Sequence, residues 1–146
     1  MDMNIVIRIV EGHAERLAER WLLRLRKEEA MMEVYLRVPE DNLLSHVRKA
    51  YEEIGTYLGQ PRHPVIAAHF RETGKRRKRE GVPLTAVVRA IQLARSVMWQ
   101  YVLEQGIFDS TVNLYQAMNL YREVVACFDQ AILFAVEGYG EEDHAA

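Results

Sequence analysis

The stretch that decides the fold is Asp109 to Tyr139, which reads DSTVNLYQAMNLYREVVACFDQAILFAVEGY. Its apolar residues recur every three or four positions, which is the spacing of one face of an α-helix. They do so on two neighbouring faces that lie about 100° apart around the helix. The first face carries Leu114, Met118, Tyr121, Val125, Phe128, Ile132, Ala135 and Tyr139. The second face carries Ala117, Leu120, Val124, Cys127, Ala131 and Phe134.

A helix that is apolar over more than half of its circumference must be covered from two sides. We expect the domain itself to cover one face and a second copy of the chain to cover the other. We assign the second face to this dimer interface, and the sequence leaves the opposite assignment open. The interface candidates are Leu120, Val124, Cys127, Ala131 and Phe134. The last helix is therefore the element that we expect to carry a signal out of the domain.

The rest of the chain also shows helical periodicity, without the alternation that is typical of strands. Prolines and glycines separate the helical runs. The pattern predicts helices over residues 4–29, from 41 or 42 to 58, over 63–79 and 83–105, and from 109 or 110 to 139. Five helices with short connections predict an all-α fold, arranged either as a bundle or as a globin-like pile. We expect one domain over residues 1–140 and a short acidic tail over 141–146.

The composition limits the classes of function. A chain of 146 residues, 49% apolar and 27% charged, is typical of one soluble globular domain. Its net charge of −2 does not favour nucleic acid or an anionic membrane as a partner. Cys127 is the only cysteine, which excludes an intrachain disulfide and a multi-cysteine metal site. No apolar run is long enough to span a bilayer, and we expect a cytoplasmic protein.

Arg95 has the most unusual position in the helix predicted over residues 83–105. It falls within the apolar stripe of that helix, which is formed by Leu84, Val88, Ile91, Met98 and Val102. A guanidinium inside an apolar face needs a partner, because an unpaired buried charge is costly. Arg95 is therefore either an anion-binding residue that lines a pocket or one half of a structural ion pair. Trp99, one turn later, either forms a wall of the same pocket or belongs to the core.

No motif indicates catalysis or a metal site. The chain has no Gly-rich phosphate loop and no GxSxG motif, and its histidines lack the i, i+4 spacing of a helical metal site. His69 lies beside the inner stripe of its helix, between Ile66 and Phe70. It is either a hydrogen-bonded core histidine or a ligand of haem or a metal. We expect a protein that is not an enzyme and has no cofactor, and a haem on His69 is the alternative.

Residues 69–95 contain a further pattern. Its members are His69, Gly74, Arg77, Gly81, Pro83-Leu84 and, eleven residues later, Arg95. The pattern resembles the amino-terminal domain of RsbT co-antagonist proteins of the RsbR type, which are stress-signalling proteins of bacterial stressosomes. By this resemblance Arg77 and Arg95 match recurrent arginines of the family, and Gly74 and Gly81 match recurrent glycines. The resemblance implies a globin-like all-α fold without haem and a sensory, non-catalytic, dimeric role.

Such domains usually pass their signal through the last helix to a STAS domain or a kinase. The resemblance therefore implies a downstream signalling protein or an output domain as partner. This chain ends in Gly138-Tyr139-Gly140 and an acidic tail. We expect either a sensor fragment of a longer protein or a domain that acts on its partner in trans.

Three functions remain open from the sequence. The leading one is a dimeric, non-catalytic sensory or regulatory domain that relays a ligand or partner signal through its last helix. The second is a globin-like protein that binds haem or another cofactor through His69. The third is a plain helical scaffold or adaptor. The candidates for a ligand pocket or a buried ion pair are Arg95, Arg77, Trp99 and His69.

Overall fold

A computed structural model describes residues 3–28, 33–35, 37–106 and 110–141, and over these residues the chain is helical apart from turns and short connections. The helices are α1 (Met3–Gly12), α2 (Ala14–Lys27), α4 (Glu40–Glu52), α5 (Ile54–Gly59), α6 (Pro64–Arg79), α7 (Leu84–Glu104) and α8 (Thr111–Gly140). A further helical turn covers residues 33–35. The predicted all-α fold is confirmed. Residues 142–146 of the predicted tail lie outside the described residues.

The first two predicted helices are each divided, so the predicted number of five main helices is wrong. The first is interrupted at His13 (φ −120°, ψ 24°) and the second at Glu53 (φ −106°, ψ 14°). At the second interruption the side chain of Glu11 accepts a hydrogen bond from the backbone N–H of Gly55, at 3.2 Å. The two interruptions therefore stabilise each other, because a residue next to one satisfies a backbone donor next to the other.

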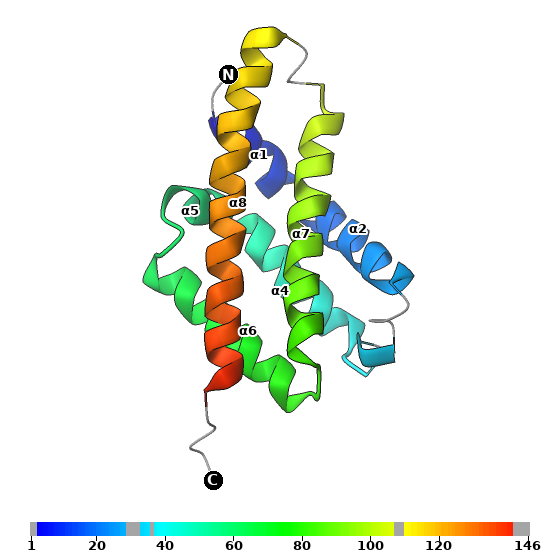
Figure 1. The fold of residues 1–146 in the computed structure, drawn as a ribbon. Coiled ribbons are helices and arrows are strands. Elements are labelled where there is room, and N and C mark those ends of the chain that lie inside the picture. The colour runs from blue at the N-terminus through cyan, green and yellow to red at the C-terminus, as the bar shows by residue number, and fades with distance from the viewer. Residues whose placement is uncertain (1–2, 29–32, 36, 107–109, 142–146) are drawn as a thin grey trace.

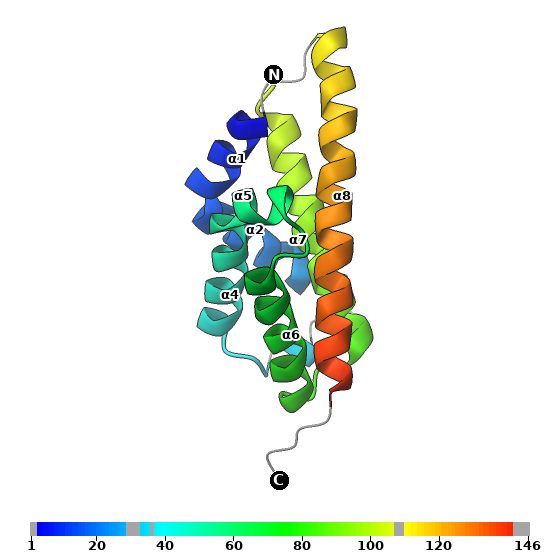
Figure 2. The same ribbon diagram turned by 90° about the vertical axis from the view of Figure 1, so that its left-hand side faces the viewer.

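Helix α8 forms a layer at one edge of the molecule (Figures 1 and 2). It packs most extensively on α6 and also on α7. On the other side of α7 lies α2, which in turn packs on α4. The core lies between these helices, and one face of α8 points away from it.

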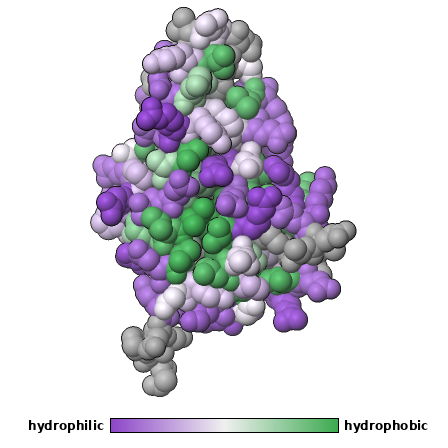
Figure 3. Space-filling model, viewed as in Figure 1, coloured by the Kyte–Doolittle hydropathy of each residue, from purple (hydrophilic) through white to green (hydrophobic). Residues whose placement is uncertain are grey.

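The structure contradicts our assignment of the second apolar face of α8 to an interface, and it also buries Phe128 and Ala135 of the first face. All five interface candidates, Leu120, Val124, Cys127, Ala131 and Phe134, are buried within the single chain. Their assignment to a dimer interface is wrong, because this face packs into the core of its own subunit. The exposed apolar residues of α8 are Leu114, Tyr115, Met118, Tyr121 and Leu133. Figure 3 shows apolar surface over the lower half of α8 and again near its upper end.

The backbones of α6 and α8 touch at two glycines. A Cβ atom on Gly74 would lie 2.0 Å from the carbonyl oxygen of Ala135, and one on Gly138 would lie 2.0 Å from that of Arg71. Ordinary contacts of a Cβ atom are 3.4–4 Å. No side chain fits at either position, so the two helices approach as closely as their backbones allow.

Helix α6 ends in a Schellman motif, which requires a residue in the left-handed region. Gly81 supplies it, with φ 80°. The N–H of Val82 donates to the carbonyl oxygen of Arg77 at 2.9 Å, and the N–H of Gly81 donates to that of Lys78 at 3.0 Å. The hydroxyl of Tyr139 then donates to the carbonyl oxygen of Val82 at 2.8 Å. The turn between α6 and α7 is thus bound to the end of α8.

Three aromatic side chains donate hydrogen bonds to carbonyl oxygens on successive turns of α7. The pairs are Tyr35 with Ala86 (3.1 Å), Trp21 with Ala90 (2.9 Å) and Tyr51 with Ala94 (2.7 Å). The donors come from the turn at residues 33–35, from α2 and from α4. The polar ends of these large buried rings are therefore satisfied, as burial requires.

Candidate functional site

An interior cavity of about 70 Å³ lies where α2, α4, α6, α7 and α8 meet. Most of its lining is apolar, with Trp21, Val47, Ile91, Ala94 and Phe128 among the lining residues. His46, His69, Thr73 and Arg77 are among its polar lining residues, together with three tyrosines, Tyr35, Tyr51 and Tyr57. A mostly apolar space with a few convergent polar groups is the usual form of a small-molecule site.

The rings of His46 and His69 are stacked, with centroids 4.4 Å apart and planes 13° from parallel. His46 Nε2 forms a short hydrogen bond with the hydroxyl of Thr73, and this hydroxyl donates to the carbonyl oxygen of His69 at 2.9 Å. Because the hydroxyl proton is used in that second bond, His46 Nε2 carries the proton of the first. His69 Nε2 is buried and has no hydrogen-bond partner among the described residues.

Both imidazoles are neutral at pH 7. Burial lowers the pKa of His46 to about 3, and electrostatic interaction with the neighbouring His69, Arg77, Arg76 and Lys49 acts in the same direction. Burial also lowers the pKa of His69, and Lys49 and Arg76 act in the same direction against the opposing effect of Glu53. Two uncharged rings can stack closely, whereas two charged rings would repel each other.

Arg77 is the buried arginine of the site. It is 4% exposed and its Nη1 contacts both carboxylate oxygens of Glu80, at 2.8 and 3.0 Å. His69, Thr73 and Arg77 are spaced by four residues, so they lie along one face of α6. The sequence pattern pointed to Arg77 and His69, and the structure places both in the cavity wall.

The other two predicted pocket residues lie elsewhere. Arg95 does not line the cavity; its Nη1 lies 3.7 Å from Asp129 Oδ1, and its side chain is 24% exposed. This is an ion pair at the edge of α7, and such pairs contribute little to stability. Trp99 is half-buried, and its ring lies 4.9 Å from that of Tyr121. Of the alternatives left open by the sequence, the structure therefore supports the ion pair for Arg95 and the core for Trp99, and neither residue lines the cavity.

Two residues of the cavity wall, His46 and Thr73, were not predicted from the sequence. His46 precedes the inward-facing Val47 by one residue, which gives a weak signal that it borders the core. Thr73 lies three residues after Phe70, which is the spacing of one helical face and gives an equally weak signal. Neither signal shows that the two side chains meet, because that contact depends on how α4 and α6 pack.

Cys127 also lines the cavity, and its thiol is buried. Burial raises the pKa of this thiol to about 12. A thiol that stays protonated is a poor nucleophile, so Cys127 acts here as a small apolar side chain.

The interior cavity beside His69 is small, because pockets that bind drug-sized ligands have volumes of roughly 300–1,000 Å³ and this cavity has about 70 Å³. Within the described residues no group of three His, Cys, Asp or Glu side chains is placed to hold a metal ion. Over the same part of the chain, no helix has the length and apolar content needed to cross a membrane.

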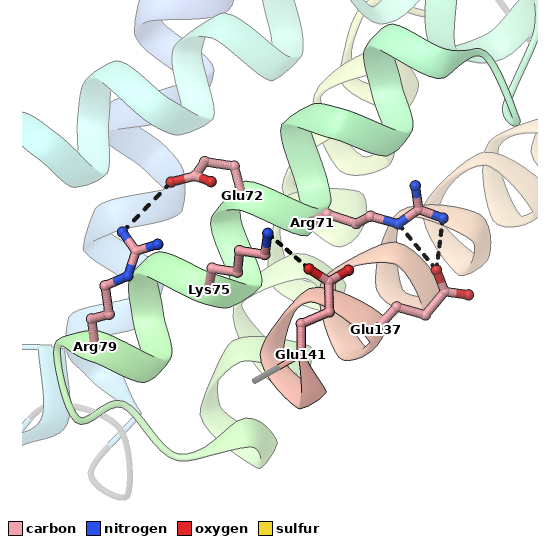
Figure 4. A network of polar contacts seen from close by, with 6 residues as sticks. All are labelled: Arg71, Glu72, Lys75, Arg79, Glu137 and Glu141. Atoms are coloured by element: carbon pink, nitrogen blue, oxygen red, sulfur yellow. Dashed lines mark hydrogen bonds and ion pairs between the residues drawn. The ribbon is translucent and has the colours of Figure 1, made fainter. Parts of the chain in front are cut away.

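Helix α6 connects the cavity to α8. Gly74 follows Thr73 directly, on the neighbouring side of α6 that touches the backbone of α8. The side chains of Arg71 and Lys75 extend from α6 to carboxylates of α8 (Figure 4). Arg71 Nη2 lies 3.0 Å from Glu137 Oε2, and Lys75 Nζ lies 2.8 Å from Glu141 Oε2. These exposed pairs link α6 to α8 beside the backbone contact between the two helices.

The basic run over residues 75–79 is largely used within the fold. Besides Arg77, the ammonium of Lys78 lies 5.8 Å from the ring centroid of Tyr139. Arg79 Nη1 lies 3.8 Å from Glu72 Oε1. The run therefore belongs mainly to the contacts of α6 with its own carboxylates and with α8.

Comparison with known proteins agrees with the resemblance noted from the sequence. No curated protein and no solved structure is significantly similar to the chain. Residues 15–146 match the family described as "RsbT co-antagonist protein rsbRD N-terminal domain". The match covers all of α2 except Ala14, as well as every later helix, and it includes every residue of the cavity wall. The chain therefore belongs to the family of RsbT co-antagonist N-terminal domains, which are regulatory, non-catalytic domains of stress signalling.

Proposed function

We propose that this chain is a dimeric sensory domain in which occupancy of the interior cavity is relayed through α6 to α8. The observation that carries the proposal is the double role of α6. One face of it supplies His69, Thr73 and Arg77 to the cavity, and the adjacent side, at Gly74, touches the backbone of α8. A displacement of α6 by a ligand must therefore move α8 or break their contact, because close-packed interfaces do not deform continuously.

The exposed apolar surface of α8 supports a dimer. Leu114, Met118 and Leu133 are more than half exposed, at 55%, 63% and 55%. Large apolar residues gathered on one helix are typical of an interaction surface. In a dimer built on this face, α8 of one subunit contacts α8 of the other, so a shift of α6 reaches a second subunit or a downstream signalling partner.

Sedimentation velocity tests the dimer. We expect a dimer at micromolar concentration for the unmodified chain and a monomer for Met118→Glu, with unchanged helical circular dichroism. Leu23→Glu is the matched control, because Leu23 is an apolar side chain of similar exposure (58%) that lies on α2. A monomeric unmodified chain, or equal behaviour of the two variants, would contradict the proposed interface.

Electron spin resonance distances test the relay. A spin label on a cysteine introduced at the exposed Asn119 reports the separation of the two α8 helices. We expect the cavity-filling variant Ala94→Val to shift this distance, because it displaces α6. Leu23→Ala should leave the distance unchanged. A distance that does not respond to any change in the cavity would leave a scaffold without a relay.

The haem-binding alternative has less support, since the interior cavity beside His69, at about 70 Å³, is smaller than pockets that bind drug-sized ligands. If the chain is a scaffold without a ligand, substitutions in the cavity should change the stability of the protein but not the distance between the α8 helices.

A further inference from the structure

A second space lies on the outside of the protein next to the cavity. It is an open groove of about 500 Å³ between α4 and α6, lined by Asn42, Ser45, His46, Lys49, Glu53, Val65, Ala68, His69, Glu72 and Arg76. The groove and the interior cavity share His46 and His69 among their lining residues. The stacked imidazole pair is therefore the partition between solvent and the interior.

The two imidazoles of this partition differ in their hydrogen bonds. His46 is fixed by its hydrogen bond to Thr73. His69 Nε2 is buried without a partner, which is rare for a side-chain nitrogen in a folded protein. A molecule in the cavity that pairs with this nitrogen gains a hydrogen bond that the empty protein lacks.

The charges around the pair do not favour an ionic occupant. Lys49 and Arg76 face the pair from α4 and α6, and Glu53 and Glu72 line the same groove. Behind the pair, the guanidinium of Arg77 is already neutralised by Glu80. Positive and negative groups are thus balanced at the entrance, and the interior beyond it is mostly apolar.

The volume limits the size of the occupant. A water molecule takes about 30 Å³ of the liquid, and a protein cavity of about 150 Å³ binds benzene. A cavity of about 70 Å³ therefore holds roughly three or four non-hydrogen atoms. The tautomer of His69 decides whether Nε2 donates or accepts, and a hydroxyl group pairs with either form.

We propose that the cavity binds a small neutral molecule, mostly apolar and with one hydroxyl or carbonyl group that pairs with His69 Nε2, and that the His46–His69 pair is its entrance from the groove. This inference rests on the proposed function, because it names the class of ligand that the sensory domain detects. It places recognition on α6, which is the helix in contact with α8.

Nuclear magnetic resonance titration of the full chain tests the binding site. The probes are 2-propanol, acetone and xenon, and the readout is the methyl shifts of Ile91, Ala94 and Ala131, which line the cavity. We expect saturable shifts at these methyl groups with all three probes. Ala94→Val should abolish them by filling the space, and Val87→Ile serves the same purpose if that variant does not fold.

The hydrogen bond is tested with His69→Phe, which keeps a ring in the partition but removes the nitrogen. We expect about fivefold weaker binding of 2-propanol or acetone and unchanged binding of xenon. His13→Phe is the matched control, because His13 is exposed on another part of the chain. Equal loss for xenon would overturn the pairing with His69. Shifts that do not saturate, or that persist after filling, would overturn the site and leave a cavity that holds water alone.

The entrance is tested by the exchange rate of 2-propanol from line shapes. We expect His46→Ala to speed exchange about tenfold or more, because it opens the partition. Val65→Ala changes the groove without changing the partition and should have no effect. An unaltered rate in His46→Ala would place the entrance elsewhere. Binding in the cavity without any change in the distance between the α8 helices would refute the relay but not this binding site. A distance that changes in the cavity variants while no probe binds would refute the binding site but not the relay.

Discussion

Replacement of Gly74 by alanine should separate α6 from α8. The added Cβ would lie 2.0 Å from the carbonyl oxygen of Ala135 and 2.7 Å from the backbone nitrogen of Tyr139. Both atoms belong to the backbone, so no side-chain rotation relieves the overlap. The helices must move apart by about 1 Å or more to reach ordinary contact distances.

The expected loss of stability combines two opposing effects. Overpacking a close contact costs about 1–3 kcal/mol and sometimes more, and a backbone overlap belongs at the upper end of that range. Alanine in place of a helical glycine recovers about 1 kcal/mol. We therefore expect the free energy of unfolding to fall by about 2 kcal/mol, which corresponds to a melting temperature about 4–8 °C lower for a chain of this size.

Thermal and urea unfolding, followed by circular dichroism, measure this change. Gly138→Ala should show a loss of similar size, because its Cβ would lie 2.0 Å from the carbonyl oxygen of Arg71. The matched control is Gly140→Ala in the same helix, where a Cβ meets nothing within 4 Å. If all three variants melt at the same temperature, the backbone contact between α6 and α8 does not exist and the relay loses its basis.

Three further outcomes are expected. The free energy of unfolding should fall as the pH is lowered from about 6.5 toward 3, because the unfolded chain binds a proton that folded His46 excludes. The expected loss is about 2 kcal/mol at pH 5. Unfolding of His46→Gln should depend less on pH. The thiol of Cys127 should react with a disulfide reagent such as DTNB at pH 8 only when the protein unfolds, because burial raises the pKa of this thiol to about 12; rapid labelling of the native protein would contradict the buried placement. Tyr139→Phe should cost about 1 kcal/mol through loss of the bond to Val82, while Tyr115→Phe, at an exposed ring, should be neutral in the same urea titration.

The sequence predicted α6, α7 and α8 well because their ends carry local signals. Pro64 and Pro83 stand at the starts of α6 and α7. Gly81, with its positive φ, follows the end of α6. The interruptions at His13 and Glu53 lack such a signal at the residue itself. The apolar pattern continues through both, and the interruption is stabilised by a contact between distant segments, from Glu11 to Gly55.

The assignment of the two faces of α8 failed for a related reason. Periodicity gives the amount of apolar surface on a helix, whereas the face that turns inward depends on the neighbouring helices. Here Gly74 and Gly138 set the rotation of α8, because they are the positions at which a second backbone can approach.

The cavity was predicted in part, through Arg77 and His69. Arg95 drew attention because it interrupts an apolar stripe, yet it lies close enough to the edge of α7 to reach Asp129. Arg77 stands in a basic run that resembles a solvated helix end, but it is the buried member of that run. The difference lies in tertiary packing, since a stripe on one helix does not show where the surface of its neighbour ends.

The three aromatic donors on α7 have a mechanical consequence. One side of α7 accepts hydrogen bonds over three successive turns, from Tyr35, Trp21 and Tyr51. Rotation of this helix about its axis would therefore break three hydrogen bonds together. Helix α7 is therefore the fixed frame of the domain. The relay that we propose therefore requires α6 and α8 to move relative to α7 rather than together with it.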